Sequence, residues 1–274
     1  MHFHEDQTVS LFLDNLKIIE EIHSSFHHIV FYQHEKLGKV LVIDHEIMHI
    51  EKYQCFYHEP LVHLPFAIKH DIKTVLILGG GSLFAANEVL KYKSVDKIVL
   101  CDHDSNVLEL MNKYYDHAQK VLADNRFFYV ENDVIRFLQT NKLKFDLIIN
   151  DCFDLSKVFL NNYNLYDELD NHLTQKGLCS DLIYDDIFNR NTMRTSLKYL
   201  QKKRSLFYSL VYVPEYPGVL HLQTIWSKGV HTLDTKRLNV DQLNISNVGG
   251  YEYYNPYYLN YYLYLPKIVR DIIE

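Results

Sequence analysis

Two aspartates stand three positions apart where a short apolar run gives way to a polar stretch. Asp151 ends the run FDLIIND, and Asp154 follows it within CFD. If the run is a strand and the polar stretch is a loop, both carboxylates can face one cleft. Such a pair can bind a cationic amine and accept the proton that the amine must lose before it attacks an electrophile. The alternative for Asp154 is a capping role within the loop.

Three consecutive glycines, Gly79, Gly80 and Gly81, follow the apolar residues VLIL and precede Ser82. Glycines let the backbone approach a ligand closely, and the start of a helix offers free N–H groups. A dinucleotide fold has G-x-G-x-x-G, but Phe84 occupies the third glycine position, and no Gly-Lys-Ser/Thr follows as in a P-loop. The turn therefore favours a nucleoside of the adenosylmethionine type.

Two further acids end the next two predicted strands. Asp102 ends KIVLCD, about 20 residues beyond the glycines, where a carboxylate can accept hydrogen bonds from ribose hydroxyls. Asp133 ends RFFYVEND, where it can accept from an adenine amino group. Either acid alone could equally cap the following helix. Because all these features fall at the carboxyl ends of successive strands, we expect a nucleoside-binding site.

The elements that position these residues alternate between strand and helix from Thr74 onward. The patterns predict strands at 74–79, 97–102, 126–133, 145–151 and 177–183, with helices at about 84–92, 105–119, 134–140 and 163–174. Two more strands, in LFYSLVYVPEY and VLHLQTIWSKG, would close the sheet as an antiparallel hairpin. This order predicts an α/β fold, a Rossmann-like doubly wound sheet of the class I methyltransferase type.

The residues before this sheet predict a small antiparallel β domain over 1–56, followed by the catalytic domain over 57–274. Two β-rich runs flank HEKLGK, which indicates a hairpin that turns at Gly38. In YHEPLVHLPFAIKH the apolar residues have near-helical spacing, and Pro60 and Pro65 predict breaks in that helix. The tyrosine-rich C-terminal segment predicts a helix whose tyrosines pack.

The composition and charge of the chain limit the kinds of molecule that we expect it to bind. The net charge is −7 over 274 residues, which argues against a nucleic-acid partner and suits a cationic substrate. No run approaches the roughly 20 apolar residues of a membrane span, and the N-terminus lacks the features of a signal peptide. We therefore expect no membrane partner and a cytoplasmic location. The four cysteines form no CxxC pair, and the 16 histidines show no HExxH-like helical spacing, so we expect no metal site.

From about Gly38 to the C-terminus, the order of motifs resembles the spermidine synthase (polyamine aminopropyltransferase) family. GKVLVIDHEIMHIEKYQCFYHEPLVHLP is similar to the family's hairpin and its YHE…HLP helix. VLILGGGSLFAANEVLKYKSVDKIVLCDHD resembles its donor-binding turn and ribose acid, and FDLIINDCFD resembles its Asp-Ser-Ser-Asp loop. PGVLHLQTIWSKG and YYNPYYLNYYLYLP resemble its closing strands and terminal helix.

The resemblance implies transfer of an aminopropyl group from decarboxylated S-adenosylmethionine to a small-molecule amine such as putrescine, with release of methylthioadenosine. The donor would be a co-substrate, and no cofactor would be bound permanently. Asp102 would bind the ribose and Asp133 the adenine. The resemblance also suggests a homodimer or homotetramer.

On the acceptor side, the resemblance implies that Asp151 deprotonates the attacking amine. Asp154 and Tyr57 would orient the acceptor, and His58 would lie near the transferring group. The sulfonium is already an excellent leaving group, so such an enzyme mainly aligns two cations and removes one proton.

The chain also departs from the family pattern. Ser82 stands where the family usually has an aspartate for the donor's aminopropyl ammonium, and Leu83 and Phe84 replace a Gly-Gly pair. Met48 replaces a hairpin glutamine, and His221 replaces a tryptophan of the closing strands. The segment LSKVFLNNY replaces the Pro and Gly-Pro that follow the second aspartate.

Three hypotheses follow. The first is an aminopropyltransferase, which the retained Asp151, Asp154 and Tyr57 favour. The second is an enzyme that uses intact S-adenosylmethionine for methyl or aminocarboxypropyl transfer or for donor cyclisation. Ser82 favours this second hypothesis, because losing an acid removes a repulsion where a donor carboxylate would sit. The third is a non-catalytic binding homologue, which the preserved acids disfavour.

Overall fold

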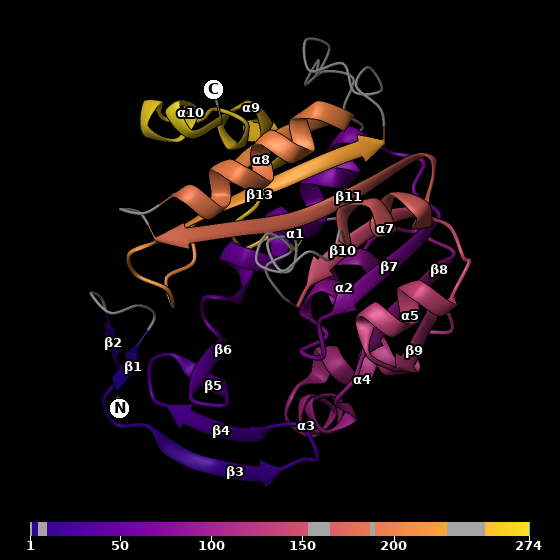
Figure 1. Ribbon diagram of the computed structural model, residues 1–274. Coiled ribbons are helices and arrows are strands. Elements are labelled where there is room, and N and C mark those ends of the chain that lie inside the picture. Colours follow the sequence, from indigo (N-terminus) through magenta and orange to yellow (C-terminus); the bar gives the residue numbers. More distant parts are fainter. Residues whose placement is uncertain (1, 5–9, 153–164, 187–189, 229–249, 274) are drawn as a thin grey trace.

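The computed structural model describes residues 2–4, 10–152, 165–186, 190–228 and 250–273 (Figure 1). This part of the chain contains a central sheet and a separate N-terminal sheet. Within these ranges none of the helices has both the length and the apolar character needed to cross a bilayer.

Seven strands form the central sheet in the order β12-β13-β11-β10-β7-β8-β9. They are β7 (Thr74–Gly79), β8 (Lys97–Asp102), β9 (Phe127–Glu131), β10 (Phe145–Asp151), β11 (Leu173–Asp186), β12 (Arg204–Val211) and β13 (Val219–Lys228). The strands from β7 to β11 pair in parallel, and β13 runs antiparallel to both β11 and β12. The chain steps outward from β7 to β9 and then returns to the other side of β7 at β10. This order confirms the predicted doubly wound, Rossmann-like sheet.

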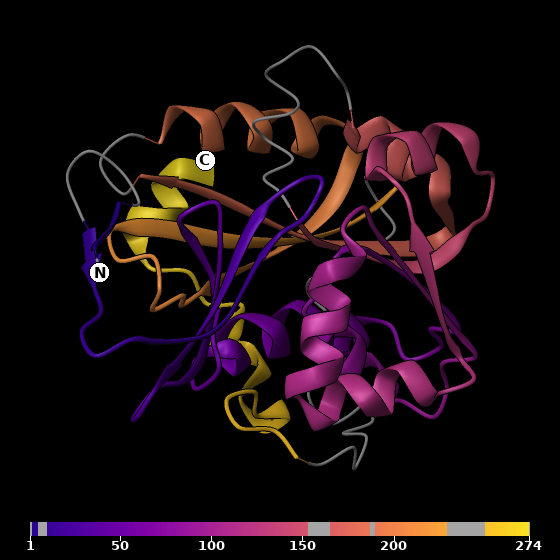
Figure 2. The same cartoon turned by 90° about the horizontal axis from the view of Figure 1, so that it is seen from below.

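Helices cover both faces of the central sheet (Figure 2). One face carries α1 (Gln54–Ile68), α2 (Phe84–Leu90), α3 (Ser105–Tyr114) and α4 (Asp116–Ala123), and the other carries α5 (Val134–Thr140), α7 (Leu165–His172), α8 (Asn191–Lys203) and α10 (Lys267–Ile273). Successive residues of β7 alternate between these layers: Val75 and Ile77 pack on the α1 side, and Leu76 and Leu78 pack on the α8 side. The apolar run is unbroken because both faces of the strand are buried.

The N-terminal part forms an antiparallel sheet, as predicted. Its strands β3 (Lys17–His23), β4 (His28–His34), β5 (Gly38–Ile43) and β6 (Glu46–Ile50) pair in sequence order, and β1 (His2–His4) pairs with β2 (Ser10–Phe12). Gly38 has a φ of +78° at the β4–β5 turn, which explains the glycine there. Ile29, Phe31 and Leu41 join the core on the α1 side of the central sheet, and Phe31 packs on Tyr114 at the end of α3 and on Tyr115, so the N-terminal sheet contacts the helical layer of that side.

The prediction that Pro60 and Pro65 break the helix is wrong, because α1 continues through both prolines. Pro65 has no N–H for the carbonyl of Leu61, and the Ser180 hydroxyl donates to that carbonyl instead at 2.8 Å. The amide of Gln223 donates to the Pro60 carbonyl at 3.0 Å. The Ser180 hydroxyl on β11 therefore replaces the helix hydrogen bond that Pro65 cannot make, and Gln223 on β13 adds a second contact to the same helix, which persists.

Other boundaries also differ from the predictions. The helix expected at 105–119 is two helices, because Tyr115 is extended (φ −133°, ψ 126°) and separates α3 from α4. β11 is longer at both ends than the predicted strand. The C-terminal helix is divided into a 3-10 turn, η2 (Pro256–Tyr258), a short α9 (Leu259–Tyr262) and α10, with Pro266 just before the last.

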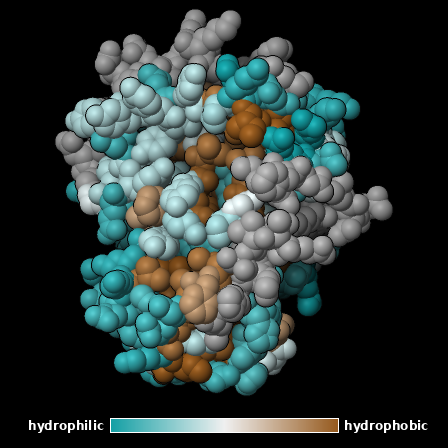
Figure 3. All heavy atoms as spheres, turned by 90° about the vertical axis from the view of Figure 1, so that its left-hand side faces the viewer, coloured by the Kyte–Doolittle hydropathy of each residue, from teal (hydrophilic) through white to brown (hydrophobic). Residues whose placement is uncertain are grey.

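The tyrosine-rich tail is only partly packed. Tyr254 is buried and its ring stacks on Tyr262, whereas four others are exposed: Tyr257, Tyr258, Tyr261 and Tyr264. The packing prediction is therefore wrong for these four. Exposed apolar side chains also occur in the N-terminal sheet, and one face of the molecule shows hydrophobic residues gathered in patches (Figure 3).

We expect Ser180→Ala to lower the free energy of unfolding by about 1–3 kcal/mol, because it leaves the Leu61 carbonyl buried without that donor. In a Pro65→Ala background the helix regains an N–H that can reach this carbonyl, so the same substitution should cost roughly 1 kcal/mol less. Urea unfolding of the four proteins measures this difference. Strictly additive costs would show that Ser180 does not act through the Leu61 carbonyl.

Candidate active site

The predicted glycine turn and two of the predicted acids meet at one edge of the central sheet. β7 lies between β8 and β10, and the register places Gly79 beside Asp151 and Leu78 beside Cys101. The chain reverses its direction of winding between β7 and β10, and in open α/β sheets ligands bind at such switch points. The structure therefore brings the glycines, Asp102 and Asp151 together at a position suited to a ligand.

The glycine turn is packed closely against the end of β10. Gly79 and Gly80 have φ angles of +71° and +77°, and the N–H of Gly80 donates to the Asp151 carbonyl at 3.1 Å. A Cβ added to Gly79 would lie 2.1 Å from the Cβ of Cys152, and one added to Gly80 would lie 2.8 Å from Asp151 Oδ2. Both the backbone conformation and the contact with β10 therefore require glycine.

The third glycine orients Asp102. The N–H of Gly81 donates to Asp102 Oδ2 at 3.1 Å, and the N–H of Asp104 donates to Oδ1 at 3.1 Å. Burial raises the pKa of Asp102, and these hydrogen bonds oppose the rise. His103 Nδ1 lies 3.7 Å from Asp102 Oδ1. A carboxylate oxygen accepts more than one hydrogen bond, so Asp102 keeps acceptor capacity for a hydroxyl ligand.

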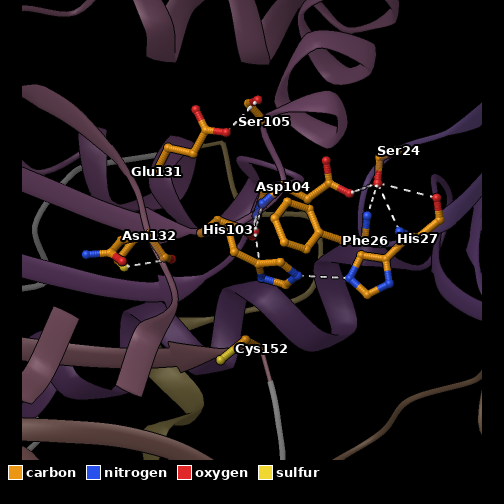
Figure 4. A network of polar contacts seen from close by, with 12 residues as sticks. Ser24, Phe26, His27, His103, Asp104, Ser105, Glu131, Asn132 and Cys152 are labelled. Atoms are coloured by element: carbon orange, nitrogen blue, oxygen red, sulfur yellow. Dashed lines mark hydrogen bonds and ion pairs between the residues drawn. The ribbon is translucent and has the colours of Figure 1, made fainter. Parts of the chain in front are cut away.

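A turn of the N-terminal sheet also reaches this edge (Figure 4). Ser24 Oγ donates to Asp104 Oδ2 at 2.6 Å, and His27 Nε2 lies 3.0 Å from His103 Nε2. The exposed ring of Phe26 meets His103 edge-on at 4.8 Å. The sequence did not predict this contact, because no local pattern links the FHH segment to residues after β8.

Asp133 follows β9 and begins α5. Its Oδ1 accepts from the N–H of Arg136 at 2.8 Å, and the residue is exposed. This is the capping geometry that the sequence left open as an alternative. The end of β9 is joined to the end of β8, because the N–H of Asn132 donates to the Asp102 carbonyl at 3.1 Å.

The Asp151 side chain is only 5% exposed. Burial raises its pKa to about 7, and a hydrogen bond from Tyr57 opposes the rise. Burial also raises the pKa of the Tyr57 phenol, so this hydroxyl keeps its proton and donates. Oδ2 of Asp151 has no hydrogen-bond partner among the described residues. The carboxylate can therefore take up a proton near neutral pH.

His58 lies on the other side of this carboxylate. Its Nε2 is 4.0 Å from Asp151 Oδ1, and its Nδ1 is 2.8 Å from the carbonyl of Gln54. Burial lowers the pKa of His58 to about 4, so the ring is neutral. The proton is on Nδ1, which donates a hydrogen bond to the carbonyl, and Nε2 is therefore an acceptor with a lone pair facing Asp151.

Ser82 begins an aromatic wall beside the glycine turn. Its carbonyl is 3.1 Å from His117 Nε2, and the His117 ring stacks on the buried Phe84 at 4.2 Å. His49 and His58 also contact Phe84, with ring centroids 5.0 and 5.2 Å away. Burial lowers the pKa of both His117 and His49, that of His49 to about 3. The wall is therefore uncharged.

Other predicted or divergent residues are placed as follows. Asp154 lies outside the described residues, as does the segment LSKVFLNNY. Met48 is exposed on β6, and His221 is buried on β13 beside Tyr184 and Tyr216. Burial lowers the pKa of His221 to about 4.

A further buried acid was absent from the predicted site. Asp181 on β11 is fully buried, and its Oδ1 accepts from the amide of Asn150 at 2.7 Å. Asn150 immediately precedes Asp151, so Asp181 is held next to the strand that carries the central carboxylate. The available signal was an acid inside the otherwise apolar run GLCSDLI.

The fold and this edge define a Rossmann-like transferase with a nucleoside-type turn beside a buried carboxylate. Residues 54–237 match the family model described as the spermine/spermidine synthase domain. This chain belongs to that family. The match begins at the first residue of α1 and ends beyond β13, so it includes the whole central sheet.

Similar proteins carry consistent names. A polyamine aminopropyltransferase of Caldicellulosiruptor saccharolyticus is 30% identical over 99% of this chain and 98% of its own length. One from Buchnera aphidicola subsp. Acyrthosiphon pisum is 27% identical over 93% and 91%. The crystal structure of spermidine synthase from Thermotoga maritima superposes with a TM-score of 0.82 at 26% identity, covering 99% of this chain and 92% of that one. A spermidine synthase in complex with the transition-state analogue AdoDATO gives the same TM-score and identity, covering 99% and 93%.

We expect Asp151→Asn to gain stability relative to the wild type as the pH rises. The folded carboxyl ionises near pH 7 and the unfolded one near its ordinary 3.8, so between these values the folded state holds a proton that the unfolded state has lost. Wild-type stability therefore falls with rising pH in this window, whereas asparagine does not titrate. The difference in unfolding free energy should grow by roughly 2–3 kcal/mol between about pH 5 and about pH 8.

Urea unfolding at both pH values measures this difference. Asp96→Asn, at an exposed position, is the matched control and should run parallel to the wild type. Parallel behaviour of Asp151→Asn would contradict the raised pKa of Asp151.

Proposed function

We propose that this chain is an aminopropyltransferase that moves the aminopropyl group of decarboxylated S-adenosylmethionine to a polyamine-type amine and releases methylthioadenosine. The observation that carries the proposal is the buried Asp151, whose pKa of about 7 suits a general base, placed directly beside the glycine turn. The relatives named polyamine aminopropyltransferase and the similar spermidine synthase with AdoDATO support the same chemistry.

On the donor side, the nucleoside rests on the glycine turn. Asp102 accepts hydrogen bonds from the ribose hydroxyls, because its carboxylate is oriented by Gly81 and Asp104 and has acceptor capacity left. Asp133 accepts from the adenine amino group with the oxygen that does not cap α5. The donor enters as a co-substrate, and the protein holds no permanent cofactor.

On the acceptor side, Asp151 takes the proton from the amine. The nitrogen then forms a bond to the aminopropyl carbon while the carbon–sulfur bond breaks. The electron pair of that bond goes to the sulfonium, which becomes the neutral thioether of methylthioadenosine. Tyr57 and Asp154 orient the acceptor, and the neutral His58 lies near the transferring group with a lone pair that attracts a cation.

Ser82 supports one alternative, in which the donor is intact S-adenosylmethionine. An aspartate at this position would repel the donor carboxylate, whereas Ser82 stands beside uncharged rings. Methyl transfer, aminocarboxypropyl transfer or donor cyclisation would follow from that donor. A non-catalytic role is the weakest alternative, since it leaves the buried carboxylate of Asp151 without a purpose.

We further propose a cytoplasmic homodimer or homotetramer. The exposed tyrosines of the tail and the exposed apolar side chains of the N-terminal sheet are the surfaces that support self-association.

Asp151→Asn should lower turnover at least about 100-fold, because the amine loses its proton acceptor. The donor dissociation constant should change less than about threefold, since Asp102 and the glycine turn are untouched. Steady-state kinetics and calorimetry measure the two quantities, with the exposed Asp71→Asn as the control for loss of a carboxylate elsewhere. Unchanged turnover would remove Asp151 from the proposed role.

Calorimetry with decarboxylated and intact S-adenosylmethionine separates the two donors. We expect the wild type to prefer the decarboxylated form, and Ser82→Asp to increase that preference about tenfold by attracting the ammonium and repelling the carboxylate. Ser82→Asn is the matched control, with similar shape and no charge. Tight binding of the intact donor alone would reject aminopropyl transfer in favour of the alternative.

A further inference from the structure

Three potential metal ligands share the outer face of the first hairpin of the N-terminal sheet. β3 and β4 are antiparallel, and His23 on β3 stands directly opposite His28 on β4. Glu21 lies two residues before His23, so the strand period of two brings it to the same face. The other face is used differently: the neighbouring Glu20 forms an ion pair with Lys113 of α3, and Ile22 packs on the main core.

The side chains of this group already meet. His28 Nε2 lies 2.7 Å from Glu21 Oε1, and the rings of His23 and His28 stack in parallel with centroids 4.3 Å apart. One ligand atom from each of the three residues lies within 4.8 Å of the others. Within the described ranges, this is the one group of at least three such residues with that proximity.

We propose that Glu21, His23 and His28 form a binding site for a divalent transition-metal ion of the zinc type. Two imidazoles and one carboxylate are a ligand set that zinc uses when a fourth position is left to water. Zinc bonds of about 2.0–2.2 Å in a tetrahedron put neighbouring ligand atoms roughly 3.4 Å apart. The farthest ligand atoms must therefore approach by about 1.4 Å at most, and the hydrogen-bonded pair of His28 and Glu21 must separate by about 0.7 Å. The partly exposed side chains of Glu21 (47%) and His28 (27%) have room for these shifts.

A metal ion at this end of the β3–β4 hairpin would stabilise the adjoining turn. The metal would join β3 to β4 at the end of the hairpin where the turn Ser24–His27 begins. That turn contacts His103 and Asp104 beside the nucleoside edge, so an ion at its base would brace it. The ligands themselves are separate from that edge, because His27 points to His103 while His28, next in the chain, pairs with Glu21.

The sequence prediction of no metal site rested on helical ligand spacing. On a strand the relevant spacing is two, and a third ligand comes from the opposite strand of the hairpin. EIH followed by FHH meets both conditions, with a tight turn between them. Imidazole and carboxylate together suit zinc and its neighbours rather than magnesium or calcium.

The test is calorimetric titration of untagged, EDTA-treated and dialysed full-length protein with ZnCl₂. The wild type should bind one equivalent that His23→Ala and His28→Ala lose or bind at least tenfold more weakly. Glu21→Gln keeps an acceptor for His28 but removes the charge, and it should also weaken that equivalent about tenfold. His70→Ala, which removes an exposed histidine elsewhere, should bind as the wild type does.

A second measurement uses Co²⁺ on the wild type alone, where the visible absorption of tetrahedral cobalt should appear and Zn²⁺ should abolish it. Thermal melting in EDTA should show a cooperative transition for every variant, so that a loss of zinc binding is distinguished from a loss of folding. Absence of zinc binding by the wild type overturns the proposal. Equal zinc binding by the wild type, His23→Ala and Glu21→Gln also overturns it, since the histidine cluster would then be an ordinary hydrogen-bonded surface.

Discussion

The close contact between the glycine turn and the end of β10 is the constraint on which the site depends. The Gly80 N–H fixes the Asp151 carbonyl, and there is no room for a Cβ on Gly79 or Gly80. Two parallel strands can therefore end side by side, with the ligand turn on one and the carboxylate on the other. A larger residue in the turn would push the two strand ends apart by the width of a side chain, so the geometry of the proposed transfer rests on this packing.

Burying the Asp151 carboxylate at that contact costs solvation free energy, and its neighbours offset only part of this cost. Tyr57 donates to the carboxylate, but burial dominates and the pKa rises to about 7. Tyr57 is carried by α1, in which Ser180 replaces the donor that Pro65 lacks and Gln223 donates to the Pro60 carbonyl. Glu59 on the same helix accepts three backbone N–H bonds from residues 252–254 of the tail. The Tyr57 hydroxyl that contacts Asp151 is thus positioned by a helix that is anchored from several distant parts of the chain.

The sequence predicted those features that depend on neighbours in the chain. Apolar runs located the strands, and the glycines and strand-end acids located the edge at which Asp102 and Asp151 meet. The sequence-based prediction was wrong where a residue's hydrogen-bond partner is distant in the chain. Pro60 and Pro65 do not break α1, because Ser180, more than a hundred residues away, donates to the Leu61 carbonyl. The contact of His27 with His103 and the buried Asp181 were missed for the same reason. Such partners become visible only when topology brings distant segments together.

Burial also explains how a chain with 16 histidines keeps a site suited to cations. It lowers the pKa of His49, His58 and His117, so these rings carry no charge near the turn. Asp102 and Asp151 remain, and the charge of Asp102 helps to raise the pKa of Asp151. In the proposed reaction, the positive charge of the acceptor amine beside Asp151 would relieve that repulsion and favour ionisation of Asp151, so acceptor binding would itself prepare the base. Asp102 on the donor side and Asp151 on the acceptor side would attract the two cations, so the proposed chemistry is compatible with Ser82 in place of an acid.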